Sequence, residues 1–101
     1  MIQTKIEIPM DKIIAFCHKW KIKEFSLFGS VLRDDFRPDS DVDVMVSFEE
    51  NAGWDLGDWV DMIEELKIIF GRDVDLLEKG SIRNPFRRHS IMTTKEVLYA
   101  A

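Results

Sequence analysis

Two aspartates stand two residues apart in an otherwise apolar stretch, Asp41-Val42-Asp43-Val44. Alternate residues of a β-strand point to the same face, with Cα atoms about 6.5 Å apart, so Asp41 and Asp43 are predicted to project together. Adjacent carboxylates repel each other, and a cation offsets that repulsion. Oxygen ligands of this kind suit Mg²⁺, which commonly binds through carboxylates together with substrate phosphates. The pair therefore predicts a metal site for phosphoryl transfer; the alternative is two solvated acids on a half-exposed strand.

A glycine and a serine precede this pair by about ten residues. Gly29 follows an apolar stretch, and a glycine allows a ligand to approach the backbone closely. Ser30 is predicted to begin a short helix, where free N–H groups and the helix dipole favour an anion. A phosphate bound there would lie near the aspartate pair if the two strands are neighbours, which the short connection favours. The alternative is an ordinary strand-to-helix turn with Ser30 as its N-cap.

A third acid would complete a metal site, and a later apolar stretch supplies two candidates. Asp73 and Asp75 alternate with Val74 and Leu76, so both are expected on one face of a short strand. Strand periodicity alone does not choose between them.

The elements that must position these residues follow from hydrophobic periodicity and from Gly, Pro and Asn stop signals. Helical spacing of apolar residues ends at Gly71, and Asn84-Pro85 is typical of a helix start. Helices are expected at 10–19, at 56–70 and from Pro85 onwards, and strands at 22–28, 41–48, 74–77 and 96–99. This alternation predicts an α+β fold, a small mixed β-sheet with helices packed against it.

Composition narrows the class of protein. With 101 residues and 46% hydrophobic residues, the chain is expected to form a single domain, 1–101. No apolar run is long enough for a membrane span, and Cys17 as the one cysteine allows neither an internal disulfide nor a cysteine zinc site. These features favour a cytoplasmic protein without membrane association.

Charge is unevenly distributed along the chain. Residues 34–65 contain twelve Asp and Glu and one Arg, within a chain whose net charge is −5. This pattern argues against direct nucleic-acid binding, which would require a basic stripe. Divalent cations or a basic partner surface would offset the acidic segment, and a merely solvated face is the alternative. An exposed apolar helix face near Trp54 and Trp59 would serve either a homo-oligomer or a different partner.

The chain resembles the minimal nucleotidyltransferases (MNT) of the DNA polymerase beta-like nucleotidyltransferase superfamily. Their hallmark is Gly-Ser, then about ten residues, then Asp-x-Asp, and a third acid on a later strand. The resemblance covers roughly residues 10–100 and implies the nucleotidyltransferase (polymerase beta-like) fold. The matching segments here are Leu27-Phe28-Gly29-Ser30, Arg33, Ser40-Asp41-Val42-Asp43-Val44, Val74-Asp75-Leu76-Leu77 and Asn84-Pro85-Phe86-Arg87.

The resemblance assigns a role to each matching residue. Gly29 and Ser30 would bind the triphosphate of ATP or another nucleoside triphosphate, and Arg33 would contact phosphate or form an ion pair. Asp41 and Asp43 would coordinate Mg²⁺. Asp75, which the match selects over Asp73, would be a metal ligand or the base that activates the acceptor hydroxyl. The predicted catalytic set is therefore Asp41, Asp43 and Asp75.

The same resemblance implies a partner. Family members of this size resemble antitoxins paired with a HEPN-type ribonuclease toxin, and the expected reaction transfers a nucleoside monophosphate, AMP from ATP, to a hydroxyl on that protein. The alternative is a non-catalytic antitoxin that masks the toxin by occupancy. One residue departs from the pattern: Asp34 follows Arg33 where the family commonly has glycine, and it adds negative charge beside the predicted phosphate site.

Overall fold

The computed structural model of the chain describes residues 8–29 and 41–101. Within these ranges four strands form one mixed sheet in the order β3-β2-β1-β4. The β1 strand pairs antiparallel with β2 and with β4, whereas β2 and β3 run parallel. The expected α+β fold with a small mixed sheet is confirmed. The strands are β1 (Ile22–Phe28), β2 (Val42–Phe48), β3 (Val74–Glu78) and β4 (Glu96–Ala100).

The helices begin and end at the residues that the sequence signals indicate. Asp55 caps α2 (Leu56–Phe70) in a reciprocal capping box with Asp58, and Gly71 ends that helix in a left-handed conformation, with φ 69°. The side chain of Asn84 accepts from the first free N–H groups of α3 (Pro85–Thr94). The remaining helices are α1 (Met10–Lys19) and the short 3₁₀ turn η2 (Lys79–Ser81). The short helix predicted to start at Ser30 lies outside the described residues.

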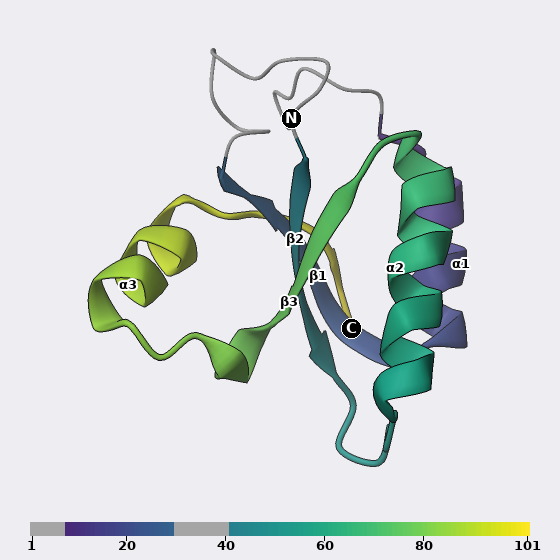
Figure 1. The fold of residues 1–101 in the computed structure, drawn as a ribbon, viewed down its shortest axis with the longest axis horizontal. Coiled ribbons are helices and arrows are strands. Elements are labelled where there is room, and N and C mark those ends of the chain that lie inside the picture. Colours follow the sequence, from purple (N-terminus) through teal and green to yellow (C-terminus); the bar gives the residue numbers. More distant parts are fainter. Residues whose placement is uncertain (1–7, 30–40) are drawn as a thin grey trace.

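The two faces of the sheet are covered by different helices. Figure 1 shows α1 and α2 side by side on one face and α3 on the other. Alternation along β2 sends Val42, Val44 and Val46 into the core beneath α1 and α2, while Asp43 and Met45 face the side of α3. The sheet is thus the middle layer between two unequal helical layers.

Most of the apolar core lies on the face beneath α1 and α2. Phe25, Leu27 and Leu66 are fully buried there, and Trp54 and Trp59 pack against the same cluster. An exposed apolar helix face does lie near these tryptophans, on α2, where Leu56 and Val60 are exposed, but the rings of Trp54 and Trp59 themselves pack against the core. The smaller cluster on the other face consists of Phe28, Met45 and Ile91, joined by the partly buried Leu77, Ile82 and Met92. No helix in the described residues has the length and apolarity required to cross a bilayer.

Candidate active site

Three neighbouring strand positions bring the predicted residues to one end of the sheet. In the parallel pairing of β2 and β3, Asp43 lies directly opposite Asp75. In the antiparallel pairing of β1 and β2, Asp43 lies opposite Phe28, the residue before Gly29. The Val42 N–H donates to the Asp73 carbonyl at 3.0 Å, which fixes this register where both strands begin. Residues far apart in the sequence thus occupy adjacent backbone positions, as expected for neighbouring strands.

Gly29 is required both by its backbone conformation and by its closest neighbour. Its φ is +71°, in the left-handed region that residues with a side chain rarely adopt. A Cβ at this position would collide with the Asp43 carboxylate and would lie 3.1 Å from its Cγ. The missing side chain therefore leaves room for the Asp43 carboxylate against the turn that follows β1.

The structure separates the two candidates for the third acid. Asp73 precedes β3, and its carboxylate lies 3.8 Å from the ammonium group of Lys67 on α2. Asp75 lies within β3, is exposed, and shares its register position with Asp43. Of the two, Asp75 is therefore the acid aligned with the Asp-x-Asp pair. Asp41 is exposed and lies one residue before β2.

Two of the predicted site residues, Ser30 and Arg33, lie outside the described residues. Among the residues that are described, no group of three or more His, Cys, Asp or Glu side chains is gathered closely enough to hold a metal ion. The sheet register therefore aligns the backbones of the acids without assembling their carboxylates into a finished ion site. The assignment of Asp41, Asp43 and Asp75 to a metal stays a prediction.

Comparison with known proteins identifies the family. The family model of the nucleotidyltransferase domain matches residues 10–98. The chain belongs to the nucleotidyltransferase domain family. The resemblance inferred from the Gly-Ser and Asp-x-Asp spacing is confirmed, and the chain is accordingly an enzyme of the nucleotidyltransferase class.

Individual relatives of this nucleotidyltransferase point the same way. A candidate protein adenylyltransferase of Methanocaldococcus jannaschii is 42% identical over 73 residues, 72% of this chain and 73% of the relative. The protein adenylyltransferase MntA of Thermococcus cleftensis is 32% identical over 81 residues, 80% of this chain and 77% of the relative. The fold is shared with a chain in the solved complex of a tri-AMPylated HEPN toxin from Shewanella oneidensis with an MNT antitoxin. That match has a TM-score of 0.63 and 21% identity, and it covers 91% of this chain and 70% of the other.

The cysteine and the two histidines of the nucleotidyltransferase lie on α1 and α3, not on the strands that carry the acids. Burial raises the pKa of the Cys17 thiol to about 12, so the thiol stays protonated and unreactive at neutral pH. His18 is exposed on α1 and lies edge-on to the ring of Tyr99, with the two ring centroids 5.9 Å apart. His89 is exposed on α3. These residues are structural or solvated, and the acids at the strand ends remain the candidates for chemistry.

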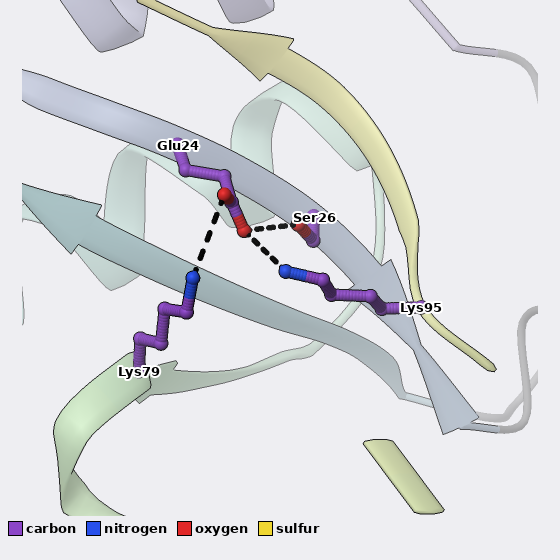
Figure 2. Close-up of polar contacts among 4 residues, drawn as sticks. All are labelled: Glu24, Ser26, Lys79 and Lys95. Atoms are coloured by element: carbon purple, nitrogen blue, oxygen red, sulfur yellow. Dashed lines mark hydrogen bonds and ion pairs between the residues drawn. The ribbon is translucent and has the colours of Figure 1, made fainter. Parts of the chain in front are cut away.

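A polar cluster on the same face of the sheet was missed by the sequence analysis. Figure 2 shows Glu24 of β1 between two lysines: its carboxylate lies 2.5 Å from Lys95 Nζ and 3.6 Å from Lys79 Nζ. The fully buried Ser26 donates to the same carboxylate at 3.4 Å. Lys79 lies in η2 and Lys95 caps the end of α3, so one carboxylate ties both ends of the segment carrying α3 to β1. The available signal was a glutamate and a serine alternating with buried residues in an otherwise apolar strand.

The Lys95 ammonium beside Glu24 holds the pKa of that carboxyl below its usual value of 4.5, mainly through their hydrogen bond. Partial burial opposes this effect, and the charge of Lys79 supports it. Glu24 is therefore ionised at neutral pH and already paired with Lys79 and Lys95, so its role is structural rather than metal binding or proton transfer.

Proposed function

We propose that this chain transfers a nucleoside monophosphate, AMP from ATP, to a hydroxyl group on a HEPN-type partner protein in a Mg²⁺-dependent reaction, as the antitoxin of a HEPN/MNT pair. The observation that carries the proposal is the alignment of Asp43 with Asp75 on adjacent strands, directly beside Gly29. The names of the relatives supply the acceptor class, because two of them are protein adenylyltransferases or candidates for that activity.

The reaction divides between bond exchange and proton transfer. The acceptor oxygen attacks the α-phosphorus of ATP, the new O–P bond forms, and the bond to the bridging oxygen breaks so that pyrophosphate leaves with its electron pair. The proton of the hydroxyl passes to a carboxylate, for which Asp75 is our assignment because it is exposed beside Asp43. Little covalent chemistry falls to the protein in such a transfer, so positioning and charge stabilisation supply most of the rate enhancement.

The carboxylates of Asp41 and Asp43 are of the chemical type that binds a divalent cation. Asp41 and Asp43 would hold Mg²⁺ through carboxylate oxygens, the ligand type that this ion takes alongside substrate phosphates, and the missing side chain of Gly29 leaves room for the Asp43 carboxylate. When bound, the ion would neutralise charge on the phosphates and orient the leaving group. Gly29 and Ser30 are assigned to the triphosphate, and Arg33 to a phosphate contact.

The test is label transfer from α-labelled ATP to the product of the reading frame adjacent to this chain's own gene, in the presence of Mg²⁺. Asp41→Asn removes a proposed ligand charge and is expected to lower transfer by at least about 100-fold while binding of the partner persists. Asp73→Asn is the matched control, because its carboxylate lies beside Lys67, and transfer should be retained.

Undiminished transfer by Asp41→Asn would contradict the proposal. If that variant also neutralised the toxin as well as wild type does, the chain would act by occupancy alone.

A further inference from the structure

The outer surface of α2 is unusually apolar for a helix face in contact with water. The exposed residues of this helix are Leu56, Gly57, Val60, Asp61, Glu64 and Ile68, of which three are large and apolar, two are acidic and none is basic. Leu56 is 78% exposed, Val60 50% and Ile68 81%. The spacing of four residues between positions 56, 60, 64 and 68 places them along one face of the helix. We call these four residues and Asp61 the α2 stripe.

The interior of the protein does not account for the α2 stripe. The core side of α2 is supplied by other residues, including the fully buried Met62 and Leu66. Most acids of this helix have structural partners: Asp55 and Asp58 cap it, Glu65 pairs with Lys19 at 3.0 Å, and Glu64 pairs with Lys67 at 3.7 Å. Exposed leucine and isoleucine side chains of this size lower solubility without stabilising the fold, and clustering of such side chains on a surface is typical of a protein–protein contact.

We propose that the α2 stripe is the docking surface for the partner protein and that it receives a surface with an apolar centre and a basic rim. The inference rests on the proposed function for the existence of that partner, and on the α2 stripe for the place and chemistry of the contact. Leu56, Val60 and Ile68 would be buried at the centre. Glu64 is already paired with Lys67 at 3.7 Å, whereas Asp61 lies at the edge of the α2 stripe, and a cation on the rim of the partner surface would complement Asp61 when the contact loses its water.

Charge argues against a second copy of this chain as the occupant. In a two-fold contact the same patch meets itself, so the Asp61 carboxylates of the two copies would be brought into one contact. Such juxtaposed like charges disfavour association. A ribonuclease partner, in contrast, is expected to carry basic residues that contact RNA phosphates, and such a surface would complement Asp61.

The α2 stripe and the acids lie on opposite faces of the sheet, and the chain connects them from the end of α2 to β3. α2 covers one face of the sheet (Figure 1). Asp43 faces the other, because along β2 it alternates with the core residues Val42 and Val44. The C-terminal end of α2, where Ile68 lies, leads through Gly71 directly to the start of β3 and Asp75. A partner seated along α2 would therefore extend to the edge strand β3, from which an acceptor segment can reach the acids.

The experiment measures, by calorimetry, the Kd of the full chain for the product of the reading frame adjacent to its gene. The double variant Leu56→Ser/Ile68→Ser is expected to raise the Kd at least tenfold, because it removes the two most exposed apolar anchors on this helix. Asp61→Lys/Glu64→Lys should also raise the Kd and should reduce its dependence on salt. Phe86→Ser is the matched control: it removes an 85% exposed apolar side chain from α3 on the opposite face, and the Kd should not change.

Four results would overturn the docking surface: an unchanged Kd for the Leu56/Ile68 variant, an equal loss with Phe86→Ser, a wild-type chain that does not bind the neighbour, or self-association that the α2 variant abolishes. Transfer of label distinguishes this failure from that of the proposed function. The α2 variant should raise the KM for the partner and keep its kcat, whereas Asp43→Asn should lose kcat and keep the Kd. A raised Kd without any wild-type transfer would leave docking intact and refute the adenylylation.

Discussion

The face of the sheet beneath α1 and α2 and the face toward α3 are built from the same strands by alternation, yet they differ in what they bury. The first buries a continuous apolar cluster that includes Phe25, Leu27 and Leu66, each fully buried. The second buries three residues in its small cluster and also carries Asp43, Asp75 and the polar group around Glu24. Burial of apolar surface is the main stabilising contribution, so most of the stability is expected to come from the first face.

This difference places the stabilising apolar core and the mutually repelling carboxylates on opposite faces of the sheet. Carboxylates aligned on adjacent strands repel each other and reduce stability unless a cation is present. The large core on the opposite face offsets that cost, because the strands that carry the acids also contribute buried valines and a leucine to it. We therefore expect changes on the core face to alter stability and changes on the acid face to alter activity, and the following variants test that division.

The largest effect on stability is expected from Leu66→Ala on the core face. The lost side chain is fully buried, so the free energy of unfolding should fall by about 2–5 kcal/mol. Ile68→Ala on the same helix is the control, because its side chain is 81% exposed and the change should stay within about 0.5 kcal/mol. Urea denaturation measures both. Below the melting transition, Leu66→Ala should retain its rate of label transfer, and a parallel loss of kcat would break the division between the faces.

Gly29→Ala should affect both properties, and Gly71→Ala separates its two causes. Both glycines have a left-handed φ, +71° and +69°, so each alanine should cost about 1–2 kcal/mol of stability. Only at Gly29 would the new Cβ collide with the Asp43 carboxylate; at Gly71 there is nothing within 4 Å. Transfer should therefore fall at least about tenfold for Gly29→Ala and stay near wild type for Gly71→Ala. Equal activities in the two variants would show that the Asp43 contact has no role in catalysis.

The smallest effect is expected from Glu24→Gln, and it should depend on pH. Since the folded state holds the pKa of Glu24 below 4.5, the ionised carboxylate contributes stability that is present above that value and is lost as the pH falls through the lowered pKa. The variant should lose about 1–2 kcal/mol at pH 7, and the difference from wild type should shrink below pH 4.5.

Glu65→Gln is the control for that measurement, because its partner Lys19 is 60% exposed and such surface pairs contribute little. Thermal unfolding as a function of pH compares the two variants. A Glu24→Gln deficit that persisted unchanged in acid would show that the charge of Glu24 is not what ties the α3 segment to β1.

Sequence patterns predicted most of the fold because local signals decided it. The alternation in β2, the stop at Gly71 and the cap at Asn84 each act within a few residues, and the structure confirms all three elements. The alignment of the acids was predicted only by analogy, since Asp73 and Asp75 have the same periodicity. The choice between them depends on strand register and on Lys67 of α2, which are properties of the assembled sheet.

The features that escaped the sequence analysis all depend on tertiary contacts. Glu24 meets Lys79 and Lys95, which lie on separate later elements, and no local pattern links these three residues. An exposed apolar helix face was expected near Trp54 and Trp59, but its residues were not predicted: the two rings pack against the core, and Leu56, Val60 and Ile68 form the exposed surface. Helical periodicity gives the existence of an apolar face, but which side chains the sheet covers is settled only by how the helix is rotated upon it.

The parallel pairing of β2 with β3 also determines at which stage of folding Asp75 comes to lie beside Asp43. Parallel neighbours cannot be joined by a tight turn, so the chain must form and dock the whole of α2 before Asp75 can lie beside Asp43. Long-range pairings of this kind form late, because the intervening chain must first be ordered. A nascent chain that has emerged from the ribosome only as far as α2 therefore has its Asp-x-Asp segment but no aligned third acid. On the proposed assignment of Asp75, a molecule in which β3 has not yet paired with β2 would not catalyse the transfer.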